Sequence, residues 1–445
     1  MPMGPFLIFD KSSLESLNLD EAVMLDNFYM SNITPLFFVE CLADLEKAIR
    51  SRSTPEQLVG SLATRTPESQ SYPNVHHSTI LRGELAGRFD LRAVHGRVML
   101  AGGRRVQLGG KKGVVFEQSP EAEAVSRWGK REFLELERQT AKQWRRALTA
   151  IDLEAMTKQV MGELGHWRKP KSLADARQMA DTIIDNTEPE WLIPFGLNLL
   201  GAPETVEYVL HNWIQVRRPP IREHLPYFVF MLSINIFFCL VLPTQLLRNV
   251  KPSHKIDLAY LYYLPFCSVF TSKDNFHAQI VPLFFSPEQT FVNGVEFKED
   301  LAKLVAHYLA LPDEVLKTGL IHFAAHPPED NGFLTTRLWD KHLPGWREIA
   351  AAPKPAHDAA EEKQLIEEIN RQTDSPELEP HDEEDIDKLD YATVRRMVYP
   401  QKGRWLRFSV EQIERMVEHE KQRSTGIKTE VVGQSAAASS SSTPE

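Results

Sequence analysis

Short apolar runs with the length of β-strands alternate along this chain with longer stretches that have the character of amphipathic helices. Residues 5–9, 33–39 and 268–273 are runs of the strand type. Apolar runs of this length, bounded by polar or turn-forming residues, are typical of strands buried in a sheet. Strands that alternate with helices predict an α/β fold with a mainly parallel sheet between helical layers, a three-layer α/β/α arrangement.

Acidic residues occur at four related places in this pattern. Asp10 closes the first run and Glu40 directly follows the second, where we expect a helix to start. Asp257 lies in the helix-like stretch 256–261, and Asp274 follows the run that ends in Ser272-Lys273. Side chains at the carboxyl ends of neighbouring parallel strands meet in one crevice. Several carboxylates in such a crevice suit Mg²⁺ or Mn²⁺, which prefer oxygen ligands.

In this order, the four acids resemble the PIN and PIN-like nuclease superfamily, together with the phrase Phe270 to His277. The resemblance covers residues 4–50 and 205–290. It implies a metal-dependent nuclease in which Asp10, Glu40, Asp257 and Asp274 act as catalytic metal ligands. The sequence departs from a compact PIN domain in one respect, because 217 positions separate Glu40 from Asp257. We therefore expect an inserted module.

The domain organisation follows from this gap and from shifts in composition. The expected parts are a first PIN-like segment (1–68), a basic α+β insertion (69–204), a second PIN-like segment (205–300), a helical extension (301–352), an acidic linker (353–390), a C-terminal helical segment (391–425) and a disordered tail (426–445). The last helical segment has an apolar stripe that could serve a protein partner or dock back on the core. A chain of 445 residues commonly divides in this way.

Composition indicates an intracellular protein. The three cysteines lie in apolar stretches without paired spacing, which excludes a disulfide framework and a zinc site. No cleavable secretory segment is visible after Met1, so we expect a cytoplasmic location. Tyr227 to Leu242 is nearly all apolar, but a membrane span needs about 20 such residues. A buried core helix is favoured there, and we expect no membrane partner.

Charge is distributed unevenly along the chain. Fourteen acidic residues against three basic ones give residues 358–390 a net charge of −11, whereas the whole chain carries −10. This stretch has too little apolar content to fold alone and reads as a solvated linker, with a mimic of nucleic acid as the less favoured alternative. From Arg82 to Arg146 the local charge is instead +7, from fifteen basic and eight acidic residues.

The basic region contains two predicted elements. Residues 97–116 alternate β-prone runs with glycine pairs, which predicts an antiparallel hairpin. The glycine pairs form no phosphate loop, because no Gly-Lys-Ser/Thr follows them. Residues 120–161 read as one long helix, either a nucleic-acid surface or a solvated amphipathic helix. The candidate phosphate contacts are Arg104, Arg105, Lys111, Lys112, Arg131, Arg145 and Arg146.

Weaker candidates surround the acidic quartet. Ser272 could fix the Asp274 carboxylate or a ligand water, and His277 could touch phosphate, although packing is the favoured role for His277. Asp44 lies one helical turn after Glu40 and could extend the cluster, but a surface acid is the simpler interpretation. His76 and His77 are adjacent, and on a strand they would point to opposite faces, so we expect no metal pair there.

The resemblance to PIN-like nucleases therefore implies hydrolysis of phosphodiester bonds with Mg²⁺ or Mn²⁺ as cofactor and nucleic acid as partner, RNA being favoured over DNA. Two rival hypotheses remain open. One is a PIN-like module that binds nucleic acid or protein without cutting it. The other is a membrane-attached interaction protein. The presence of all four acids favours the enzyme.

Overall fold

A computed structural model of the full chain provides the structure of this protein. It describes residues 4–46, 53–88, 96, 98–100, 103–150, 152–165, 167–247, 251, 253–352, 359–377, 390–396 and 398–418. The expected disordered tail (426–445) and most of the acidic linker therefore lie outside the described residues.

The centre of the molecule is a five-stranded sheet in the order β3-β2-β1-β6-β7, and every pair in it is parallel. Its strands are β1 (Phe6–Phe9), β2 (Met30–Ile33), β3 (Ser71–Pro73), β6 (Val269–Ser272) and β7 (Thr290–Asn293). The expected α/β class and parallel sheet are confirmed. Strand β3 comes from the part of the chain assigned to the insertion, so the sheet takes an edge strand from that region.

Two hydrophobic cores cover the two faces of this sheet. Leu7, Phe9 and Val269 belong to one core, whereas Ile8 and Phe270 belong to the other. Successive side chains of a strand point to opposite faces, so this division shows that β1 and β6 are buried on both sides. The near-continuous apolar runs of the sequence follow from that double burial.

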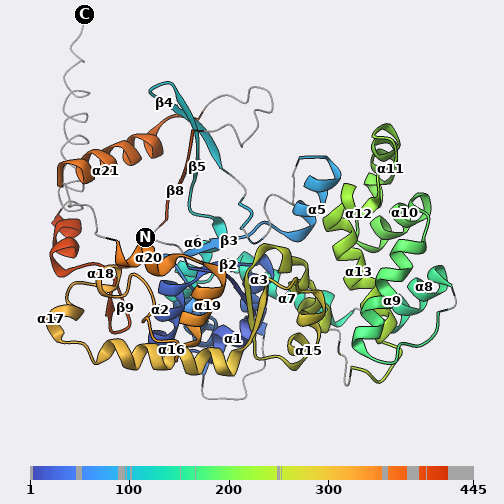
Figure 1. Ribbon diagram of the computed structural model, residues 1–445, viewed down its shortest axis with the longest axis horizontal. Coiled ribbons are helices and arrows are strands. Elements are labelled where there is room, and N and C mark those ends of the chain that lie inside the picture. Colours follow the sequence, from blue (N-terminus) through green and yellow to red (C-terminus); the bar gives the residue numbers. More distant parts are fainter. Residues whose placement is uncertain are drawn as a thin grey trace, which may run out of the picture.

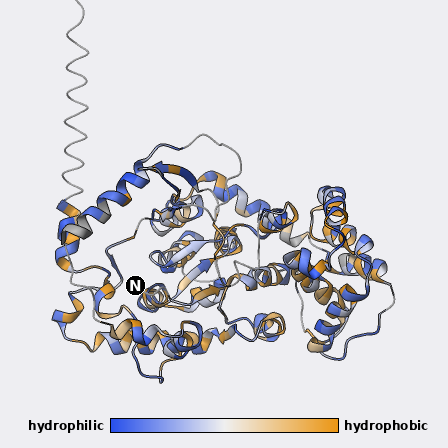
Figure 2. Cartoon of the chain, turned by 45° about the horizontal axis from the view of Figure 1, so that its top comes forward, coloured by the Kyte–Doolittle hydropathy of each residue, from blue (hydrophilic) through white to orange (hydrophobic). Residues whose placement is uncertain are grey.

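Helices provide both covering layers. The core of Leu7 and Phe9 includes residues of α1 (Lys11–Ser16), α2 (Leu19–Phe28), α4 (Pro55–Arg65), α6 (Pro120–Gly129), α7 (Glu135–Thr149), α16 (Gly294–Leu309), α18 (Leu320–Phe323), α19 (Leu334–His342) and α20 (Trp346–Ala351). The core of Ile8 includes residues of α5 (His77–Leu85), α8 (Leu153–Leu164), α9 (Leu173–Asn186), α10 (Pro189–Leu199), α11 (Val206–Gln215), α12 (Ile221–His224), α13 (Pro226–Val241), α14 (His254–Tyr260) and α15 (Asn275–Phe284). The remaining short helices are η1 (Asp44–Glu46), η2 (Pro203–Thr205), η3 (Leu261–Phe266) and α17 (Asp313–Leu316). Hydrophobic and hydrophilic residues occur together on these helices (Figure 2), as expected when one face of each is buried.

The apolar stretch 227–242 forms the buried helix α13 (Pro226–Val241), in which nearly every side chain is inaccessible to solvent. It lies in the group α8 to α13 at one end of the molecule (Figure 1) and packs against α9. Among the described residues, no helix is long and apolar enough to cross a membrane. The prediction of a core helix is confirmed.

The basic hairpin is present and has a third strand. Strands β4 (Arg104–Leu108) and β5 (Lys111–Phe116) pair antiparallel around Gly109 and Gly110, whose φ angles of 58° and 83° suit a tight two-residue turn. Strand β8 (Tyr391–Val394) pairs with β5 in parallel. The three strands and α21 (Ala359–Asp374) project together from the core (Figure 1). Local sequence could not show this long-range pairing.

The single long helix predicted for residues 120–161 is wrong. The structure has α6, α7 and α8 in its place. Arg131 has a left-handed backbone conformation with φ of 64° and lies between the end of α6 at Gly129 and the start of α7. The Asp152 carboxylate caps the start of α8. A capping residue starts a new helix because its oxygen accepts from an otherwise unpaired backbone N–H.

The run 33–39 is also not one strand. Strand β2 ends at Ile33, and α3 (Pro35–Ala43) follows at once, so Glu40 lies inside this helix and does not start it. The Thr34 hydroxyl accepts from Phe37 N, and Pro35 occupies the first helical turn. A capping threonine followed by proline is a strong helix start, and it overrides the β-prone composition.

Residues 391–425 were expected to be helical, but their described part begins with β8 and the small pair β9 (Gln401–Lys402) and β10 (Trp405–Leu406). Of the described residues in this segment, only 410–418 are helical. The acidic stretch is likewise not entirely a linker, because residues 359–374 form α21, which contacts β4 and β8. Partners far away in sequence determine both outcomes.

One buried acid should make stability depend on pH. Both carboxylate oxygens of Glu84 accept at 2.8 Å from Tyr227 N and Phe228 N at the start of α13. Burial raises the pKa of Glu84 to about 7 from an ordinary 4.5. The unfolded state therefore ionises first, so the unfolding free energy should fall as pH rises from 4.5 through 7, by roughly 3 kcal/mol at most. Glu84→Gln has no ionisable group at this position. Its unfolding free energy, measured by urea unfolding, should therefore fall less steeply with pH between pH 5 and 8. An identical slope would contradict this prediction.

Candidate functional site

Asp10 stands at the carboxyl end of β1 and caps α1. Its carboxylate accepts from Ser13 N at 2.9 Å, from the Ser12 hydroxyl at 2.8 Å and from the Ser272 hydroxyl at 2.6 Å. Ser272 ends β6, the neighbouring strand, so two adjacent strands meet at this carboxylate. Parallel strands bring such residues together because all their carboxyl ends lie at one edge of the sheet.

His277 lies next to Asp10 and is fully buried. Its Nδ1 is 2.9 Å from Ser272 Oγ and 3.4 Å from Asp10 Oδ2, while its Nε2 is 2.8 Å from the carbonyl oxygen of Asp257. Burial alone would lower the pKa of His277, but the hydrogen bond and charge of Asp10 raise it to about 9. Burial in turn acts to raise the pKa of Asp10, and the protonated His277 outweighs it, so that pKa is lowered. The two form a buried ion pair.

Glu40 projects from α3 into the same region. The Tyr260 hydroxyl donates to its carboxylate at 2.5 Å. Burial raises the pKa of Glu40 to about 7, and repulsion from Asp257 and Asp10 adds to this effect, whereas Tyr260 and Lys11 oppose it. A carboxyl group with a pKa near neutrality can take up and release protons under ordinary conditions.

Asp257, on α14, has no hydrogen bond or ion pair through its carboxylate to any described residue. Burial raises its pKa to about 6; the charge of His277 opposes the rise, and repulsion from Asp274 and Asp10 increases it. Asp274 follows β6 and caps α15, where its carboxylate accepts from Phe276 N at 2.7 Å. Asp257 repels Asp274 and Asp10, and Glu40 repels Asp257 and Asp10, so the four acids lie near one another at this edge. Their expected convergence on one metal ion stays a prediction.

Lys11 supplies a positive charge beside this cluster. Its ammonium group is 2.8 Å from Asp44 Oδ2, and the attraction of Asp44 and Glu40 keeps the Lys11 pKa raised although burial acts to lower it. Asp44 also pairs with Arg145 at 3.5 Å and is buried, so its interpretation as a surface acid is wrong. Asp44 holds Lys11 next to the four acids instead of extending them.

The arrangement does not amount to a preformed metal centre. Within the described part of the chain, which includes all four acids, no three His, Cys, Asp or Glu side chains form a group that could hold a metal ion. His277 and Lys11 provide positive charge beside the cluster, and His254 contributes next to Asp257. Burial is the main cause of the raised pKa values of Glu40 and Asp257, so ionising either carboxylate is costly in the absence of a further cation.

The neighbours of the quartet differ from expectation in detail. The Ser272 hydroxyl donates to Asp10 and accepts from Asp274 N, so it does not fix the Asp274 carboxylate. His277 cannot touch phosphate because it is buried, which confirms the packing role. His76 caps α5 and is not on a strand. Lys11 and Tyr260 were missed, although Lys11 directly follows Asp10 and Tyr260 lies one helical turn after Asp257.

The basic candidates divide into two groups. Arg104 donates to the carbonyls of Thr373 and Ser375 at the end of α21, and Arg145 donates to the carbonyl of Ala43 at 3.0 Å. These two side chains hold protein segments together. The others are Arg105, Lys111, Lys112, Arg131 and Arg146, of which Lys111, Lys112, Arg131 and Arg146 are exposed. A role in binding nucleic acid stays a prediction for all of them.

Comparison with known proteins gives no independent assignment. No family model matches the sequence, and neither curated proteins nor solved structures show a significant similarity to it. The chemistry of the site must therefore be argued from its own residues.

Proposed function

We propose that this protein is a metal-dependent nuclease whose reaction takes place at the four acids beside β1 and β6. One observation carries the proposal. Burial and mutual repulsion raise the pKa of Glu40 to about 7 and that of Asp257 to about 6, at the edge of a parallel sheet. Ionising these buried carboxylates is costly, and a bound divalent cation would offset that cost.

The donor atoms fit a hard cation in kind. Carboxylate oxygens are the ligands that Mg²⁺ and Mn²⁺ prefer, and the Asp257 carboxylate has no competing partner among the described residues. The arrangement of these carboxylates does not fit, because in the described part of the chain no three acidic, His or Cys side chains are placed to hold an ion. Asp257 and Asp274 are the residues that would hold it, with Asp10 engaged by His277 and Glu40 left to act as a base. When bound, such an ion lowers the pKa of a water molecule.

The remaining chemistry belongs to the chain itself. Glu40, with a pKa of about 7, can accept a proton from an attacking water. Lys11 lies beside Glu40 and can attract a phosphate group towards the acids. Tyr260 orients the Glu40 carboxylate through its hydrogen bond. The buried Asp10–His277 pair fixes the ends of β1 and β6 and so determines where Asp274 stands.

The preference for RNA over DNA rests on the resemblance to PIN-like nucleases. The rival hypothesis is a PIN-like module that binds without cutting, and the lack of a preformed metal group is the observation in its favour. The two hypotheses differ in one measurable respect. Only the enzyme requires the carboxylates to bind a divalent cation.

A cleavage assay decides between them. We expect the full-length protein to cut labelled RNA oligonucleotides in Mn²⁺ or Mg²⁺ and to be inactive in EDTA, with slower cutting of DNA of the same sequence. Binding without cutting under every metal condition would establish the non-catalytic alternative. Cutting that persists in EDTA would show that Glu40 and Lys11 work without metal and would overturn the metal-dependent mechanism.

A further inference from the structure

A second candidate site lies at the same edge of the sheet as the acids. It is a pocket of about 920 Å³, and its walls include Ile33 at the end of β2 with Pro35 after it, and Pro73 at the end of β3 with Asn74 after it. All strands of this sheet are parallel, so the ends of β2 and β3 lie at the edge where Asp10 follows β1. Pockets that hold small molecules have volumes of roughly 300–1,000 Å³, so the space suits one nucleotide.

Helix α3 connects the two sites. Phe38 lines the pocket, and Glu40, two residues further along the same helix, lies in the acidic cluster. Residues two apart point to roughly opposite sides of a helix, so the two sites flank α3. Strand β2 neighbours β1, so Pro35 after β2 and Asp10 after β1 follow adjacent strands, which lie about 4.8 Å apart. A strand of nucleic acid with a phosphate at the acids would therefore have a nearby nucleotide at the pocket.

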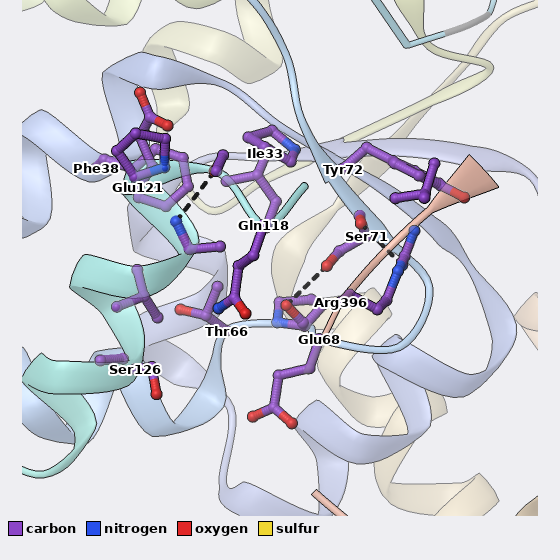
Figure 3. A pocket seen from close by; sticks show the side chains of 18 of the residues that line it. Ile33, Phe38, Thr66, Glu68, Ser71, Tyr72, Gln118, Glu121, Ser126 and Arg396 are labelled. Carbon is purple, nitrogen blue, oxygen red and sulfur yellow. Dashed lines mark hydrogen bonds between the residues drawn. The ribbon is translucent and has the colours of Figure 1, made fainter. Parts of the chain in front are cut away.

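The walls combine aromatic rings with amides. Phe38 lies on one side and Tyr72 on the other, with Gln118 between them (Figure 3). The Gln118 amide has no hydrogen bond to a described residue. The Asn74 side chain is 4% exposed, and its Nδ2 has no partner there either. Asn74 Oδ1 accepts from Val75 N and Met99 N, so Asn74 offers only its Nδ2. The free Gln118 amide and this Nδ2, beside aromatic rings, suit a nucleobase, whose edge needs donors and acceptors and whose face stacks.

Positive side chains complete the pocket. The Arg396 guanidinium lies 4.3 Å from the centre of the Tyr72 ring and donates through Nη1 to the carbonyls of Ser69 and Ser71. Lys130 and Arg395 also line the pocket, are exposed, and form no ion pair with any described residue. They can neutralise the phosphate that accompanies a base.

We propose that this pocket binds one nucleobase of a single-stranded nucleic acid whose backbone passes the acidic cluster. The identity of the ligand rests on the proposed nuclease function, whereas the pocket itself does not require a metal. Base recognition belongs to Gln118 and Asn74, stacking to the aromatic walls, and phosphate contact to Lys130 and Arg395. The C-terminal segment 394–402 thereby takes part in substrate binding, because Val394, Arg396 and Tyr399 form part of the lining.

Binding to the full-length protein in EDTA tests the pocket without any cleavage. The probes are the four nucleoside 5′-monophosphates, ribose 5-phosphate and a fluorescent single-stranded RNA hexanucleotide. We expect at least one monophosphate to bind tenfold more tightly than ribose 5-phosphate, and the hexanucleotide to bind more tightly still. Equal affinity for ribose 5-phosphate would overturn base recognition. A hexanucleotide no tighter than the monophosphates would overturn the placement of a strand and indicate a free nucleotide as ligand.

Two variants keep the test independent of folding. Gln118→Leu and Tyr399→Leu should each weaken monophosphate and hexanucleotide binding at least tenfold, with unchanged melting temperatures. Gln139→Leu, on the exposed surface of α7, is the matched control and should bind as the wild type does. Affinities of both pocket variants within twofold of the wild type would overturn the proposal. Nucleotide binding in EDTA without cleavage in Mn²⁺ would overturn the nuclease function alone.

Discussion

Replacing Arg407 by methionine should destabilise the protein by about 3–5 kcal/mol, because the change removes the nearest counter-charge of a buried carboxylate. Arg407 Nη1 is 2.7 Å from Asp26 Oδ2, and both side chains are almost inaccessible. Burial acts to raise the pKa of Asp26, but the charges of Arg407 and Lys402 hold it at about 2. Methionine keeps the apolar contacts of the side chain, so the loss measured by urea unfolding reports mainly on charge.

Two further variants separate this effect from general disruption. Arg404→Met, in the same segment as Arg407, removes the ion pair between the exposed Arg404 and Asp20, which lies on α2 as Asp26 does. This change should cost less than about 1 kcal/mol. The double variant Asp26→Asn with Arg407→Met removes both charges and should recover part of the loss, since a neutral pair needs no compensation. If Arg407→Met were as mild as Arg404→Met, residues 401–407 would not be anchored by this ion pair.

The parts of the fold that could be predicted are those that short stretches of consecutive residues determine. The run 5–9 is apolar at every position, the run 268–273 has Val269 and Phe270 among polar residues, and Asp10 and Asp274 follow the two runs directly. The sequence therefore predicted both strands and the edge of the sheet at which these acids lie. The turn at Gly109-Gly110 and the apolar helix α13 were visible for the same reason, because a few consecutive residues determine each of them.

The remainder depends on partners that are distant in sequence. Asp26 and Arg407 are 381 positions apart, and nothing local identifies them as a buried pair. Strand β8 is fixed by its pairing with β5, and Asp44 is buried because Lys11 and Arg145 reach it. At the site, the quartet was predicted but its balance of charge was not. The roles of His277, Lys11 and Tyr260 appear only when β1, α3, α14 and α15 are brought together.

The balance of charge at the site makes a substitution of Asp257 a better test of the mechanism than a substitution of Asp10. Asp10 is the partner of the buried His277, so its removal would leave an imidazolium without compensation and would confuse stability with activity. The Asp257 carboxylate has no hydrogen bond to a described residue, and burial raises its pKa to about 6 from 3.8. Its ionised form is therefore a cost to the folded protein, and asparagine of nearly the same size removes that cost.

Asp257→Asn should therefore melt at a higher temperature than the wild type at pH 8, while its cleavage in Mn²⁺ falls at least about 100-fold. The sign of the pH effect follows from linkage. The folded-state pKa is raised, so the cost is absent below about 4 and complete above about 6, and the gain in melting temperature should vanish at pH 4. Asp313→Asn, an exposed change on α17, should leave cleavage unchanged. Full cleavage by Asp257→Asn would remove this carboxylate from the mechanism. A lower melting temperature at pH 8 would instead show that a partner stabilises its ionised form.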